Sequence, residues 1–206
     1  MIEILVPFSD RLNLNGDLAN GLILTKRLAW AGTDSRIIPL SSIDEIIRAS
    51  AKCSLLSDNS FLLLGHGSKA AMESISEAKG ELVDLISAVK SSGGAGLVVG
   101  SSYEWLVPHA SKERLSEFVE SDLNLPDSKG KISAVGYVNS ASALGNMLWD
   151  GKILFTRFHG PILAKSPDLA DFFCEVLTNG KYVAKVDSKL VDAINEAKAV
   201  ALGKRD

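Results

Sequence analysis

The stretch GLVVGSSYEWL, residues 96–106, has the residue types and order of a nucleophile turn. An apolar run leads into Gly100, Ser101 and Ser102, and the residues that follow are typical of the first turn of a helix. Many α/β enzymes place a nucleophile at such a strand–turn–helix junction, because the sharp turn exposes its side chain. GSSYE departs from the G-x-S-x-G form of the motif, since Tyr103 stands where its final glycine would be.

An alternation of strands and helices is predicted to position this turn. Four short β-rich runs, bounded by Gly, Ser or Asp, are typical of strands buried on both faces: residues 2–8, 36–40, 61–64 and 97–99. Apolar residues at helical spacing predict helices over about 17–31, with Asp17 as its cap, and over about 69–91. This alternation predicts a mainly parallel central sheet with helices on both faces.

The second half of the chain is less regular. We expect a charged helix over 111–120, strands over 132–138 and 152–158, a helix over 168–177 and a terminal amphipathic helix over about 188–202. No repeat or linker divides the sequence, so we expect a single domain over residues 1–206.

Composition excludes several classes of function. The net charge is −3 and no block of like charges occurs, which disfavours nucleic-acid binding and a polybasic membrane anchor. The apolar start, MIEILVPF, is too short to insert in a membrane. Cys53 and Cys174 lack zinc-site spacing and suit a reducing cytosol, so we expect a cytoplasmic protein with both thiols buried as small apolar groups. Without a phosphate loop or a dinucleotide fingerprint, we expect no cofactor and no metal.

Three segments together resemble a known family: residues 9–37, residues 61–68 (FLLLGHGS) and residues 155–173 (FTRFHGPILAKSPDLADFF). They are similar to class I, cobyric-acid-synthase-like glutamine amidotransferases, and in particular to the glutaminase subunit of lipid II isoglutaminyl synthase. The resemblance implies a flavodoxin-like three-layer α/β/α sandwich. It also implies a subunit that hydrolyses glutamine and passes ammonia to a Mur-ligase-like partner, which amidates D-glutamate in peptidoglycan.

The catalytic positions implied by the resemblance are only partly filled. The family's cysteine nucleophile corresponds to Gly100, which has no side chain to form a thioester. Its catalytic histidine corresponds to His159, as a retained base or as a structural histidine. A glycine-rich oxyanion loop corresponds to Gly65, His66 and Gly67, in which His66 is either structural or a new contact in a changed pocket.

The glutamine-binding side implied by the resemblance diverges further. In GYVNSASAL, residues 136–144, Gly136 and Asn139 agree with the family, whereas its carboxylate-binding arginine corresponds to Ala143. Arg157 is a possible replacement for that arginine, and a strand-surface arginine is the simpler interpretation.

Three hypotheses follow from these residues. The first is a catalytically degenerate subunit that partners a Mur-ligase-like protein. The second is an active amidase or other hydrolase in which Ser101 is the nucleophile and His159 the base. The third is a module that binds a small molecule, such as glutamine or a cell-wall precursor, around His66 and His159.

Overall fold

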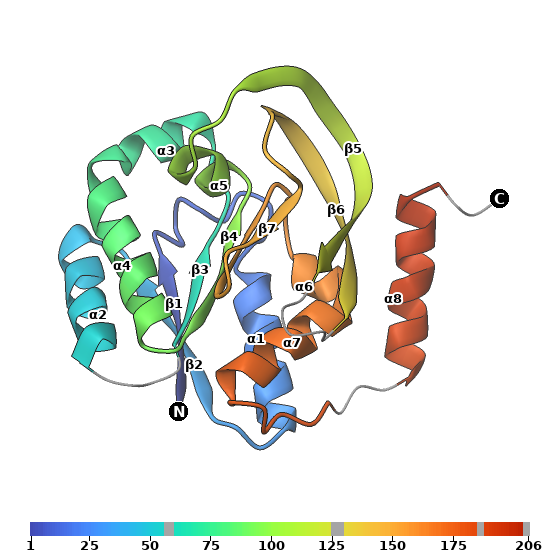
Figure 1. Ribbon diagram of the computed structural model, residues 1–206, viewed down its shortest axis with the longest axis horizontal. Coiled ribbons are helices and arrows are strands. Elements are labelled where there is room, and N and C mark those ends of the chain that lie inside the picture. Colours follow the sequence, from blue (N-terminus) through green and yellow to red (C-terminus); the bar gives the residue numbers. More distant parts are fainter. Residues whose placement is uncertain (56–59, 125–129, 185–187, 204–206) are drawn as a thin grey trace.

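The computed structural model describes residues 1–55, 60–124, 130–184 and 188–203, and a six-stranded sheet runs through its centre (Figure 1). The strand order is β2-β1-β3-β4-β8-β7, in which the first five strands are parallel and β7 is antiparallel to β8. The strands are β1 (Ile2–Pro7), β2 (Ser35–Leu40), β3 (Ser60–Leu64), β4 (Ala95–Val99), β7 (Met147–Trp149) and β8 (Ile153–Thr156). Among the parallel strands this is the flavodoxin-like order 2-1-3-4-5.

Helices cover both faces of the sheet (Figure 1). On one face lie α1 (Ala19–Trp30), α6 (Ile162–Lys165) and α7 (Pro167–Leu177). On the other lie α2 (Ile43–Leu55), α3 (Lys69–Ser74), the 3₁₀ turn η1 (Ser76–Ala78), α4 (Lys79–Ser91) and α5 (Ser101–Leu106). The predicted three-layer α/β/α sandwich is therefore confirmed.

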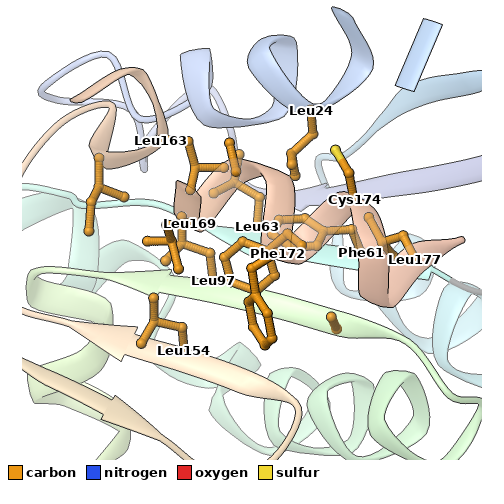
Figure 2. Close-up of a cluster of buried hydrophobic side chains, with 14 of the residues drawn as sticks. Leu24, Phe61, Leu63, Leu97, Leu154, Leu163, Leu169, Phe172, Cys174 and Leu177 are labelled. Carbon is orange, nitrogen blue, oxygen red and sulfur yellow. The ribbon is translucent and has the colours of Figure 1, made fainter. Parts of the chain in front are cut away.

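The core on the α1/α7 face explains why the central strands are continuously apolar. Figure 2 shows Leu24 of α1 and Phe172 of α7 directed toward Phe61 and Leu97 of the sheet. The rings of Phe61 and Phe173 meet edge to face at 5.0 Å. Each fully buried side chain of this size stabilises the fold by about 2 kcal/mol, so the two-sided burial of β3 and β4 holds the middle of the sheet in place.

Several helix boundaries differ from the prediction. The helix expected over 69–91 is interrupted by η1, and α2 was not predicted. The first helix begins at Ala19, and Asp17 does not cap it; instead, the side-chain oxygen of Asn13 accepts a hydrogen bond from the backbone N–H of Leu18 at 2.8 Å. Within the described residues, no helix is long and apolar enough to cross a membrane.

The charged helix predicted over 111–120 is wrong. Residues Ser111–Asn124 form strand β5, which pairs antiparallel with β6 (Lys131–Ser142) in a separate two-stranded sheet. Leu115, Val119 and Leu123 are four residues apart, a spacing that fits one face of a helix and also one face of a strand. The inner face of β6 packs on α6 and α7, so the two-stranded sheet covers that end of the central sheet (Figure 1).

The predicted terminal helix is present as α8 (Ser188–Ala201). None of its residues is buried, although Leu190 and Ile194 face α1 and α6 across an apolar groove. The helix is amphipathic, as its sequence predicts.

Candidate functional site

The candidate site lies at the carboxyl edge of the central sheet, where ligands bind in open α/β folds. Three segments meet there: the β3 loop with Gly65, His66 and Gly67, the turn at Gly100 after β4, and His159 after β8. These residues, widely separated in the sequence, were predicted to share one site, and the structure brings them into contact.

The turn at Gly100 has the strained geometry of a nucleophile elbow. Its φ of 56° and ψ of −119° lie in a region that residues with a side chain rarely adopt. The Gly100 N–H donates to the carbonyl of Thr156 on β8 at 2.7 Å, and α5 starts at the next residue. The backbone of an elbow is therefore present without the side chain that an elbow normally presents.

The imidazole of His66 occupies the space beside this turn. A Cβ atom added to Gly100 would lie only 2.5 Å from Nδ1 of His66, too close for any real contact. The same Nδ1 accepts a hydrogen bond from the backbone N–H of Ser101 at 3.0 Å. In an elbow enzyme, the N–H that follows the nucleophile stabilises the oxyanion; here it is already used by His66.

This hydrogen bond also fixes the chemistry of His66. Because Nδ1 accepts, the neutral ring carries its proton on Nε2. Burial lowers the pKa of His66, while the nearby carboxylates of Asp17 and Glu104 act in the opposite direction. The Glu104 carboxylate itself accepts a hydrogen bond from the hydroxyl of Ser140.

His159 stacks directly on His66. Their ring centroids are 4.2 Å apart with an interplanar angle of 29°. Burial is the main reason that the pKa of His159 falls to about 4, and His66, Lys165 and Arg114 lower it further. The ring is thus neutral near pH 7, the form a general base needs, but the described residues place no thiol or hydroxyl in hydrogen-bond contact with it.

The two serines of the turn bind the β3 loop. The Ser101 hydroxyl donates to the carbonyl of Gly67 at 3.0 Å and accepts from the N–H of the same residue at 3.0 Å. The Ser102 hydroxyl donates to the carbonyl of Gly65 at 2.6 Å. Both hydroxyls therefore connect the elbow to the loop that carries His66, and Ser101 is turned toward Gly67 rather than toward His159.

A buried carboxylate holds two of the three segments together. Asp17 is fully buried, and its oxygens accept hydrogen bonds from the backbone N–H groups of His66 and Gly160, each at 3.2 Å. Asn20, also fully buried, accepts from the Leu163 N–H at 3.0 Å and donates to the carbonyl of Gly160. Burial raises the pKa of Asp17 despite these donors. Asp17 belongs to the polar segment between β1 and α1, for which a helix cap and a role in positioning the site are both compatible with the sequence, and the structure shows the second.

The residues expected on the glutamine-binding side lie on β6, just after it and just after β8. Asn139 is exposed on β6, opposite Ser116 of β5, and Ala143 is exposed just after β6. Arg157 is not a strand-surface residue: it is only 2% exposed, and its guanidinium donates to the carbonyl of Ser142 at 2.7 Å.

Neither cysteine lies in the turn at Gly100. Cys53 and Cys174 are buried, as predicted, and Cys174 lies in the core cluster of Figure 2. Burial and the nearby Asp171 raise the pKa of Cys174 to about 12, so its thiol stays protonated. Across the part of the chain that the structure describes, no group of three or more His, Cys, Asp or Glu residues could hold a metal ion.

The topology and the site define a flavodoxin-like α/β protein with a glycine at the turn after β4. No protein-family model matches the sequence, and no curated protein matches it. Among solved structures, one described as a glutamine amidotransferase is similar over 85% of this chain and 98% of its own, with 17% identity and a TM-score of 0.45. A structure of TesA is similar over 48% of this chain and 60% of its own, with 18% identity and a TM-score of 0.31. Both similarities are distant, and the function proposed below depends on the residues of the site.

Proposed function

We propose that this protein is a catalytically inactive, glutamine amidotransferase-like subunit that acts as a structural partner of a Mur-ligase-like protein. The observation that carries the proposal is the His66 ring, which fills the space where the side chain of the elbow residue would lie and accepts the hydrogen bond of the elbow N–H. The partner, and the link to peptidoglycan amidation, come from the sequence resemblance described above.

The site lacks three of the groups that glutamine hydrolysis requires. Gly100 provides no nucleophile, and the Ser101 N–H is not available for an oxyanion. The guanidinium of Arg157 is directed to the backbone of Ser142, so it leaves the α-carboxylate of glutamine without a partner. His159 remains, but a base alone does not open the amide bond.

The framework around these positions is nevertheless complete. The buried Asp17 and Asn20 bind the loops after β3 and β8 by hydrogen bonds. The hydroxyls of Ser101 and Ser102 bind the turn at Gly100 to the loop after β3. A fixed arrangement of loops at this edge of the sheet suits docking of a partner, because docking requires a surface of defined shape and no catalysis.

Ammonia release from L-glutamine tests the loss of catalysis. We expect no enzymatic release from the purified protein, alone or with a Mur-ligase-like protein encoded beside it, and no difference between the wild type and Ser101→Ala. Release that Ser101→Ala abolishes would instead establish the serine hydrolase hypothesis. Release that persists in Ser101→Ala and stops in His159→Ala would also overturn the proposal.

Co-expression tests the partner. We expect the two proteins to co-elute in size-exclusion chromatography, and a charge-reversal variant of an exposed residue far from the site, Asp84→Lys on α4, should elute with the partner as the wild type does. Separate elution of the wild type and the Mur-ligase-like protein over the micromolar range would contradict the partner assignment.

A further inference from the structure

Two cationic side chains lie beside the stacked histidines. Lys165, at the end of α6, is partly buried, and among the described residues no hydrogen bond or ion pair satisfies its Nζ. Arg114, on β5, is exposed and equally without such a partner in the described part of the chain. Both are close enough to His159 to lower its pKa by electrostatic repulsion. An unpaired, partly buried ammonium group is costly, so this position favours a negatively charged ligand.

Aromatic rings form a wall next to these charges. Tyr137 of β6 meets His159 edge to face, with ring centroids 6.3 Å apart. The Phe118 ring of β5 lies on the Tyr137 ring, with centroids 5.3 Å apart. The Nζ of Lys165 lies 6.0 Å from the centroid of the Phe118 ring. Figure 1 shows β5, β6 and α6 side by side at this end of the molecule, and β6 packs on α6. The β5–β6 sheet therefore brings cations and rings to the same place from separate parts of the sequence.

Two carboxylates that act on this cluster are held by other partners. Asp17 attracts Lys165 electrostatically, but its oxygens are fully buried and accept hydrogen bonds from the backbone N–H groups of His66 and Gly160. Glu104 acts on His66, and its carboxylate is engaged by Ser140. Neither of these two carboxylates is free to pair with Lys165 or Arg114.

We infer that Lys165 and Arg114 form, with the ring of His159, a binding site for a small oxyanion, either a carboxylate or a phosphate. Lys165 and Arg114 supply the charge, and His159 supplies a ring nitrogen at the same position. Binding there needs neither an elbow nucleophile nor a partner protein, so the site extends the proposed function to that of a subunit that senses an anionic metabolite.

Binding of defined anions tests this site. The probes are L-glutamate, D-glutamate and inorganic phosphate, with L-lysine amide as the cationic control, measured by calorimetry and by NMR of the histidine imidazoles. We expect saturable binding at millimolar or lower concentration of a carboxylate or of phosphate, and none of the cation. Which probe binds distinguishes a carboxylate metabolite from a phosphorylated one. Binding should also raise the pKa of His159 above its value of about 4, because an anion stabilises the imidazolium.

Matched variants locate the binding. Lys165→Gln and Arg114→Gln should each weaken binding of the anion by about tenfold, the usual effect of losing one charged hydrogen bond. Lys112→Gln, which replaces an exposed lysine on β5, the strand that carries Arg114, should leave the affinity unchanged. Arg114 is exposed, so its replacement does not put folding at risk. The inference fails if no anion shifts the imidazole signals at millimolar concentration, or if Lys112→Gln weakens binding as much as the other two. Neither result depends on ammonia release or on the partner, so this inference and the proposed function fail separately.

Discussion

The turn after β4 and the segment after β1 both contribute to the site, but they are held in different ways. The turn depends on the absence of a side chain at Gly100 and on one contact from His66. The segment after β1 depends on a fully buried carboxylate, Asp17, that accepts hydrogen bonds from two other loops. The elbow residue thus carries no side chain, while the segment that orients the loops carries a carboxylate whose two oxygens both accept hydrogen bonds. The difference supports the proposed structural role of the site.

The largest effect should come from Asp17→Ala. The substitution leaves the partly buried N–H group of His66 and the buried N–H group of Gly160 without acceptors, at a cost of about 4 kcal/mol for the two. Urea unfolding measures the loss, and Asp10→Ala, an exposed carboxylate from the same segment, should change stability by less than about 0.5 kcal/mol. If both variants unfolded at the same urea concentration, Asp17 would not be the residue that joins the loops.

A somewhat smaller effect is expected from Gly100→Ala. The positive φ and the contact with His66 should together cost about 3 kcal/mol. Gly32→Ala is the matched control, because Gly32 has a φ of 77° and open space around its missing Cβ; it should cost about 1 to 2 kcal/mol through backbone strain alone.

A double-mutant cycle separates the two contributions at Gly100. In a His66→Ala background, Gly100→Ala should cost little more than Gly32→Ala, because the Nδ1 and Cγ atoms closest to the new Cβ are gone and only the Cβ of residue 66, at 3.2 Å, remains. Equal costs of Gly100→Ala with and without His66 would show that His66 does not fill the elbow.

The layered fold could be predicted because it depends on local signals. The buried strands 61–64 and 97–99 are continuously apolar, and glycines mark the ends of the helices between them. Strand β5 could not be predicted in the same way. Its pairing with β6 is non-local, and the four-residue spacing of Leu115, Val119 and Leu123 agrees with a helix as well as with a strand.

The site, like the fold, combines residues that the sequence indicates with contacts that only the folded chain forms. The resemblance drew attention to Gly100, His66 and His159, and the structure places all three together. No sequence pattern indicates that the His66 ring fits against Gly100, because that contact arises only when the loop after β3 meets the turn after β4. For Asp17 the sequence leaves a helix cap and a role in positioning the site open, because only the folded chain shows that its oxygens accept hydrogen bonds from two other loops.

The smallest effect concerns pH and the stacked histidines. The pKa of His159 is about 4 in the folded protein and near 6.5 in an exposed histidine, so the unfolded chain binds the proton more readily between these values. Stability should therefore be complete above about pH 6.5 and fall, by about 1 kcal/mol after allowance for partial exposure, as the pH drops toward 4. His66, whose pKa is also lowered, acts in the same direction, whereas Asp17, whose pKa is raised, opposes it in the acidic part of this range.

Unfolding midpoints across the range should have a shallower pH slope in His159→Gln than in the wild type, and His109→Gln, at an exposed histidine, should keep the wild-type slope. An NMR titration in which His159 changes charge near pH 6.5 would contradict the burial of the stacked pair, and with it the tight closure of the elbow by His66.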